Sequence, residues 1–258
     1  MNNFKKIGLS ALAGSLVAVS AHAAEISMSG GASVAFTSGD DKGKTTYYQN
    51  DSITFTVSGE TDGGLSITTS LELDGGANAS SSFDNRSLKI GHDTLGTITF
   101  SGHGGDSVLS GWDDKTPTAY EEAWALTTGN VKIDGVAGDN LWRYDSPSFS
   151  GVSFGVTYDS TVNTGTVSSY SDMGISIAPE MVEGLSMGYA VGEYTETAAI
   201  GDIDVSTLWV KYAYGPITAT ASNHDYDVGT AASDQEMSSY AISYTVSDEI
   251  SITYGQED

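Results

Sequence analysis

One stretch near the middle of the chain decides the fold: NLWRYDSPSFSGVSFGVTYD, residues 140–159. Apolar residues alternate with small or polar ones on both sides of the Ser-Pro-Ser break, first at Trp142 and Tyr144 and then up to Tyr158. A period of two is typical of a β-strand with two unlike faces. The stretch therefore predicts two strands joined by a turn, with aromatic residues on one face and Arg143, Ser, Gly and Thr on the other.

The same alternation continues along most of the chain and predicts about thirteen strands with no long helix. Turn sequences such as TDGG separate the strands, and Asp-Gly-Gly is typical of a β-hairpin. Tight turns tend to alternate with long polar loops, of which residues 104–139 form the longest. The predicted fold class is all-β, with antiparallel neighbours. Outside the opening stretch, the predicted strands cover residues 25–36, 52–60, 65–74, 86–91, 97–103, 170–178, 184–193, 202–214, 217–227, 238–246 and 249–255.

Residues 1–23 have the composition of a secretory signal peptide. Two lysines lie in a short basic start, an apolar run follows, and Ala21-His22-Ala23 provides the small residues of a cleavage site. The apolar run is shorter than the roughly 20 residues that a membrane-spanning helix needs. We therefore expect a signal peptide at 1–23 and one exported β-domain at 24–258.

Composition excludes several classes of function. The 34 acidic residues against 10 basic ones argue against a nucleic-acid partner. The chain has no Cys, so an exported protein of this kind has no disulfide framework. No His is paired with Ser and Asp at the spacing of a known catalytic triad, and no phosphate-binding loop is present, so we predict no enzyme activity and no cofactor. The acidic loops leave Ca²⁺ binding open, although no calcium-loop spacing occurs.

Two all-β architectures fit the alternation: a soluble sandwich or barrel, and an outer-membrane barrel with its apolar face toward lipid. The polar face is rich in short side chains, Ser, Thr and Gly, where a solvated sheet would use more Lys, Arg and Glu. Aromatic residues gather near strand ends, as the interfacial girdles of a membrane barrel do. These features, with the unequal connections, favour a transmembrane antiparallel β-barrel.

Two motifs carry a resemblance to a known family. RYDSPSFSGVSFGVTY, residues 143–158, and RSLKIGHDTLGTITFSG, residues 86–102, resemble segments of the general diffusion porins of Gram-negative bacteria, in the same order and at a similar separation. The resemblance implies an integral outer-membrane protein that forms a water-filled channel for passive diffusion of small hydrophilic solutes and ions, as a homotrimer. It also implies sixteen strands, so we expect the C-terminal strands to be missing here, with a twelve- or fourteen-strand barrel as the alternative.

The resemblance further implies that the loop at 104–139 folds into the barrel and narrows the channel. The alternation along the predicted strands places Lys89, Arg143 and Lys211 on the face opposite the apolar residues, which is the barrel interior. This placement is physically favourable, because a charge on the lipid face costs about 2–4 kcal/mol. Arg86 has the opposite parity and is a weaker candidate. Carboxylates on the loop would face these cations and produce a field across the constriction. The predicted loop acids are Asp106, Asp113, Asp114, Glu121 and Glu122.

Scarcity of basic residues predicts a channel that prefers cations, because carboxylates repel anions where the pore is narrowest. Trp209 has the parity of the polar face, where it either contacts a solute or packs against an inserted loop. The competing interpretation is a secreted acidic β-structured adhesin or surface-layer protein that binds Ca²⁺. That class would show internal Gly/Asp repeats, and the sequence shows none.

Overall fold

The computed structural model describes residues 24–37, 46–74, 84–115, 135–160, 167–196, 202–227, 234–247 and 250–257. The chain divides into two compact units, one ending at Thr94 and one beginning at Leu95. The predicted signal peptide at 1–23 lies outside the described residues.

The first unit is a sheet of four antiparallel strands, each paired with its neighbour in sequence. The register aligns Met28, Phe55 and Leu71 across three strands, and a row of Ser and Thr lies beside them on the opposite face. The sheet therefore has one apolar and one polar face, as the alternation predicts. Its strands are β1 (Glu25–Thr37), β2 (Thr46–Glu60), β3 (Ser66–Asp74) and β4 (Asn85–His92).

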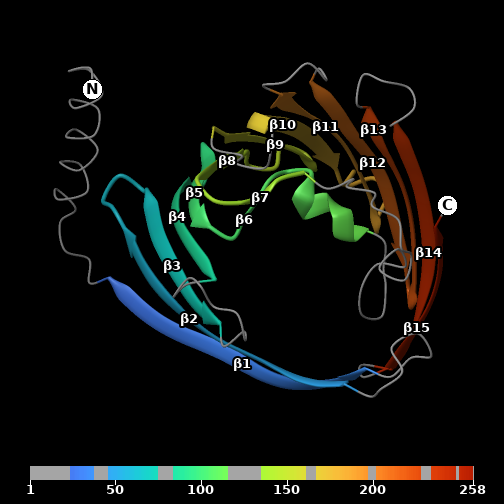
Figure 1. Ribbon diagram of the computed structural model, residues 1–258, viewed down its shortest axis with the longest axis horizontal. Helices are drawn as coiled ribbons and strands as arrows, with labels where there is room; N and C mark the ends of the chain where they lie inside the picture. The colour runs from blue at the N-terminus through green and yellow to red at the C-terminus, as the bar shows by residue number, and fades with distance from the viewer. Residues whose placement is uncertain are drawn as a thin grey trace. The chain divides into compact units, whose positions relative to one another are not determined.

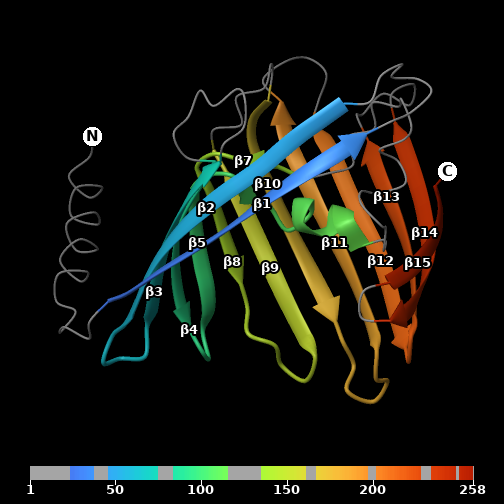
Figure 2. The ribbon, with the colours of Figure 1, turned by 90° about the horizontal axis from the view of Figure 1, so that it is seen from below.

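The second unit has nine long strands, again antiparallel and in chain order, which lie side by side in Figure 2. Together with the first unit, the described residues form the thirteen long strands that the sequence predicts, and the all-β prediction is confirmed. The nine strands are β5 (Gly96–His103), β8 (Leu141–Asp145), β9 (Val152–Asp159), β10 (Val167–Ile177), β11 (Leu185–Glu196), β12 (Ile203–Tyr214), β13 (Ile217–Asp227), β14 (Gln235–Ser247) and β15 (Ile250–Glu257).

The two faces of the second unit are the reverse of a soluble sheet. Large apolar side chains such as Phe154 and Leu208 are each 49% exposed. On the opposite face Thr157 and Thr207 are each only 1% exposed. An apolar face that is open to the surroundings, with small polar side chains on the opposite face, is the arrangement of a lipid-facing barrel wall.

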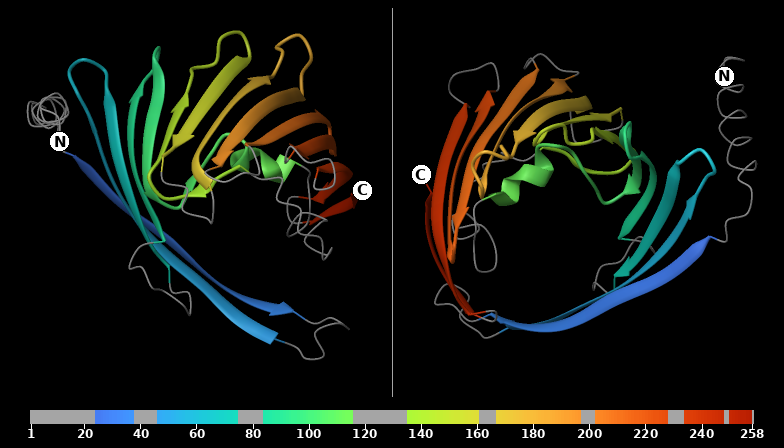
Figure 3. Two further views of the ribbon diagram at one scale, coloured as in Figure 1. Left: turned by 45° about the horizontal axis from the view of Figure 1, so that its top comes forward. Right: turned by 180° about the vertical axis from the view of Figure 1, so that it is seen from behind.

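The described turns between strands, seen from two further sides in Figure 3, differ in length. Residues 215–216 join β12 to β13, whereas residues 178–184 join β10 to β11. The turn between β8 and β9 is short, and its last residues, Ser150 and Gly151, have φ angles of 51° and 81°. A Cβ at Gly151 would collide with the carbonyl oxygen of Ala178, so this turn requires glycine on both counts. The Ser-Pro-Ser-Phe-Ser-Gly break is therefore a turn, as predicted.

The long connection between β5 and β8, residues 104–139, is called the inner loop below. It contains two short paired strands, β6 (Gly105–Asp106) and β7 (Ala137–Gly138), and a 3₁₀ helix, η2 (Ser110–Lys115). These elements are too short for a periodic signal, so the sequence did not predict them. In the described part of the chain, no helix has the length and apolar character needed to cross a bilayer.

Candidate functional site

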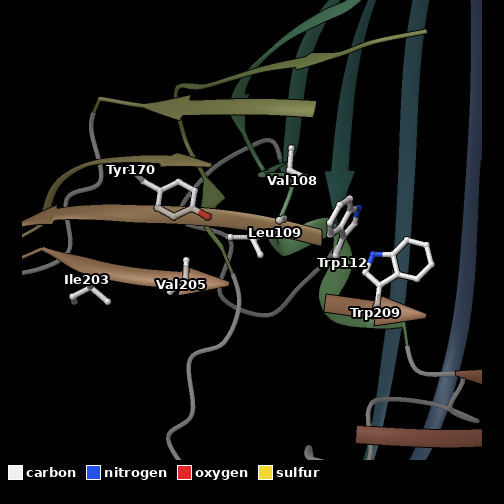
Figure 4. Close-up of a cluster of buried hydrophobic side chains, with 8 residues drawn as sticks. Val108, Leu109, Trp112, Tyr170, Ile203, Val205 and Trp209 are labelled. Atoms are coloured by element: carbon white, nitrogen blue, oxygen red, sulfur yellow. The ribbon is translucent and has the colours of Figure 1, made fainter. Parts of the chain in front are cut away.

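The described part of the inner loop lies against the polar face of the second unit. Figure 1 shows η2 on the concave side of this sheet, and Figure 4 shows the contact in detail. Val108, Leu109 and Trp112 of the loop are buried in a cluster with side chains of β10, β11 and β12. The strand residues of the cluster are Tyr170, Ala190, Ile203, Val205 and Trp209.

Two tryptophans join η2 to β12. Trp112 and Trp209 meet edge to face, with ring centroids 5.8 Å apart and an interplanar angle of 80°. Lys115 Nζ lies 5.3 Å from the centroid of the Trp209 ring, within range of a cation–π interaction. Trp209 is 6% exposed, so of the two roles predicted for it, the structure shows packing against an inserted loop.

Buried hydrogen bonds tether the backbone of the inner loop to the wall. The Val108 amide donates to Thr157 Oγ1 at 3.1 Å, and the Leu109 amide donates to Asp172 Oδ2 at 2.9 Å. Tyr170 also donates its hydroxyl to Asp172 Oδ2, at 3.0 Å. Since unpaired amides would be costly in this buried position, the wall residues at 157 and 172 specify where the loop docks.

Arg143 is a third tether. The register of β8 aligns it with Thr99 and Thr157 on the polar face, so its predicted inward parity is correct. Its Nη1 donates to the carbonyl oxygens of Asp106 and Ser107 at 3.3 and 3.0 Å. Its Nε and Nη2 donate to the Asp145 carboxylate at 2.9–3.0 Å. The guanidinium therefore holds the loop, and Asp145 offsets its charge.

The base of the inner loop is closed where it leaves the sheet. Gly105 pairs with Gly138 and Asp106 with Ala137. His103, the last residue of β5, forms an ion pair with Asp139 through Nδ1 when the ring is protonated, and a hydrogen bond otherwise. The two ends of the loop are thus fastened to each other as well as to the wall.

The other two predicted cations, Lys211 and Lys89, also lie on polar faces. Lys211 aligns with Ser186 and Thr220 and is exposed. Lys89, in the first unit, aligns with Thr68 and is exposed too. Arg86 lies opposite Leu71 on the apolar face, as its parity predicts.

The predicted loop acids are only partly described. Asp106 lies in β6, is exposed, and accepts a hydrogen bond from Ser110 Oγ at 3.4 Å. The backbones of Asp113 and Asp114 belong to η2, while their side chains lie outside what the structure describes. Glu121 and Glu122 lie outside the described residues. Their predicted role at the constriction stays a prediction.

Sequence reasoning missed the residues that receive the loop: Asp145, Thr157, Tyr170 and Asp172. One signal was available, because large aromatic residues at Tyr170 and Trp209 interrupt a face otherwise rich in Ser, Thr and Gly. Such residues need a partner to cover them. Within the described ranges, no group of three or more His, Asp or Glu side chains could hold a metal ion.

Comparison with known proteins agrees with this architecture. The sequence model of the Gram-negative porin family matches residues 8–258. An anion-selective porin from Comamonas acidovorans has a similar structure, with a TM-score of 0.59 at 16% identity over 91% of this chain and 79% of that one. OmpF of Salmonella typhi, solved with daunomycin, gives a TM-score of 0.58 at 14% identity over the same shares. No curated protein matches the chain by sequence.

At such identities the structural likeness shows the fold alone, a porin β-barrel. The family match covers nearly the whole chain, residues 8–258, so it shows membership of the family as well as the fold. Porins are outer-membrane diffusion channels without enzymatic activity, which agrees with a polar sheet face that carries a folded-in loop. The chain belongs to the Gram-negative porin family and is an integral outer-membrane channel protein.

Proposed function

We propose that the channel prefers cations, and that the inner loop, docked on the polar face of the second unit, forms its narrowest part. Small hydrophilic solutes and ions pass by diffusion, so no cofactor is needed. Lys89, Arg143, Lys211 and the loop acids line the path in this proposal. The observation that carries it is the balance of charge on the polar faces.

Carboxylates outnumber cations on the polar face of the first unit. In the described strands, the acids with polar parity are Glu25, Glu60, Glu72 and Asp74, against Lys89 alone. Asp74 aligns with Ser52, and Glu72 aligns with Thr54 and Asn85. A wall of one sign concentrates counter-ions, here cations, near it.

In the second unit, the arrangement of Arg143 supports the same preference. This residue is one of only 10 Lys and Arg in the chain, and Asp145 offsets its charge. Lys115 and Lys211 are the remaining cations of the described polar face, and Lys115 lies against the Trp209 ring. Asp106, Asp159 and Asp172 contribute carboxylates to the same face and loop. Anions meet little uncompensated positive charge there, so cations should be favoured.

Reversal potential tests the preference. With a tenfold KCl gradient across a planar bilayer, the purified wild-type chain should give the sign expected for K⁺ passing more readily than Cl⁻. Lys211→Glu should strengthen the preference, because it replaces an exposed cation on the polar face. Asp225→Asn, which removes a carboxylate from the outward face of β13, should leave it unchanged. A wild-type potential of the opposite sign would contradict the proposal.

We further propose that the channel assembles as a homotrimer, in keeping with its resemblance to general diffusion porins. The apolar face of β1 to β4 offers a surface for such a contact, with Met28 69% exposed and Phe55 37% exposed. A second copy would cover that face with protein. Cross-linking of the detergent-extracted protein should give a species of three chains, and a single-chain product alone would refute the assembly.

The adhesin or surface-layer interpretation is not favoured by the family match. The two interpretations differ in one property that can be tested: the adhesin or surface-layer protein would bind Ca²⁺, whereas the channel does not need it. Chelation with EDTA should leave the ion conductance unchanged, because no step of passive diffusion uses a bound metal.

A further inference from the structure

Four glycines form the part of the wall on which the inner loop rests. They are Gly155 of β9, Gly174 of β10, and Gly188 and Gly192 of β11. None of the four is among the residues with positive φ, so the backbone conformation does not demand glycine at these positions. Another reason is needed for the absence of a side chain at each.

The inner loop supplies that reason. A Cβ at Gly155 would lie 2.8 Å from Val108 Cγ2. One at Gly174 would lie 2.7 Å from Trp112 Cη2 and 2.8 Å from Val108 Cγ1 of the loop, and 2.9 Å from Ala190 Cβ of the wall. One at Gly192 would lie 2.7 Å from Tyr170 Oη of the wall and 2.9 Å from Leu109 Cδ1 of the loop. Real Cβ atoms do not approach other atoms this closely. At Gly155 and Gly174 the loop side chains are therefore the nearest atoms and occupy the space that a wall side chain would fill.

The glycine positions also form a continuous surface. Gly155 and Gly174 are directly opposite each other in the β9–β10 register, and Gly174 is opposite Ala190 in β11. Gly188 lies on the same face of β11, two residues before Ala190, and a Cβ there would lie 2.5 Å from Trp209 Nε1 and 3.0 Å from Trp112 Cη2. The surface without side chains thus extends from Gly155 on β9 to the tryptophan pair that joins η2 to β12.

We propose that two of these glycines, Gly155 and Gly174, are positioning residues that set how closely the inner loop approaches the wall, and so how wide a path is left for solutes. The polar tethers fix which strands the loop contacts, because they join its backbone to Thr157, Asp172 and Arg143. The glycines fix the distance between the loop and the backbones of these strands. The inference rests on the channel function of the chain and is independent of the proposed cation preference.

A single methyl group on this surface should narrow the channel. Val108 and Leu109 are each 1% exposed and enclosed on all sides, so they cannot turn away from a new Cβ without moving the loop. The tethers would still hold the loop over the same strands. The loop would therefore shift away from the wall, into the path of the solutes.

Gly155→Ala is the sharpest test, because Val108 is the one neighbour that its Cβ would meet at less than 3.0 Å. Single-channel conductance in planar bilayers should fall, and liposome-swelling assays should show a smaller size limit for neutral sugars. Gly174→Ala should have a larger effect, since it meets both Trp112 and Val108. Gly31→Ala is the matched control: it lies on the polar face of β1, and its Cβ would have no neighbour within 4 Å.

Compensation separates this role from general damage to the fold. Adding Val108→Ala to Gly155→Ala removes the colliding methyl groups and should restore both conductance and size limit toward wild type. Folding of every variant is checked by circular dichroism and heat-dependent gel migration. Wild-type conductance and size limit in both folded glycine variants, or no recovery in the double variant, would overturn the proposal. The sign of the reversal potential does not enter the comparison, so the cation preference can fail separately.

Discussion

At the scale of single residues, the face on which a side chain lies decides what it contacts. Ile242 and Ser243 are consecutive in β14 and lie at the same depth, but Ile242 is 50% exposed on the apolar face and Ser243 accepts a hydrogen bond from Thr253 on the polar face. Arg143 shows how much one position can do, because its single guanidinium joins a loop carbonyl pair to Asp145. The position of a residue in the alternation therefore predicts whether its side chain lies on the apolar or the polar face. The contacts that the side chain makes there then determine its role.

Arginine substitution at these two neighbours tests the assignment of faces. Ile242→Arg places a charge against lipid and should lower the free energy of unfolding by about 2–4 kcal/mol, the range for a charge near the bilayer midplane. Ser243→Arg, one residue away on the polar face, should lower it much less. Urea titration of the protein folded in lipid vesicles measures both. Equal losses, or a larger loss for Ser243→Arg, would mean that the faces are assigned wrongly.

At the scale of elements, the inner loop is the part of the chain that differs most from its surroundings. It is fastened at its base by β6 and β7, along its first residues by buried hydrogen bonds, and at η2 by the tryptophan pair. Hydrogen bonds and close packing thus restrain different movements of the same loop. Losing a tether should loosen the loop, whereas filling the glycine surface should displace it.

Asp172→Ala tests the tethers. It leaves the Leu109 amide and the Tyr170 hydroxyl without their buried acceptor, at a cost of about 1–3 kcal/mol for each unsatisfied group. The loop should then move between docked and undocked positions, so single-channel records should show raised open-channel noise and brief interruptions. Asp225→Ala, on the outward face of β13, serves as the control. A record as quiet as wild type would show that Asp172 does not hold the loop.

At the scale of the whole molecule, the sequence predicted the repeated parts of the structure and missed the single ones. The long strands, their faces and the turn after Asp145 follow from period-two alternation and turn residues, which every strand repeats. The docking of the inner loop does not repeat: the Leu109 amide finds its acceptor 63 residues away, at Asp172. No local pattern encodes such a contact. Inward aromatic residues at 170 and 209 were the one local sign that something covers that face.

The central claim is that the polar faces of the strands line a water-filled path and the apolar faces contact lipid. Because the chain has no Cys, single cysteines can test it directly. Lys211→Cys lies on the polar face of β12 and Val210→Cys beside it on the apolar face. A membrane-impermeant methanethiosulfonate with a charged group should react at position 211 and change the single-channel conductance, and should leave the channel with cysteine at position 210 unaltered. Modification and altered conductance at 210, with none at 211, would contradict the account.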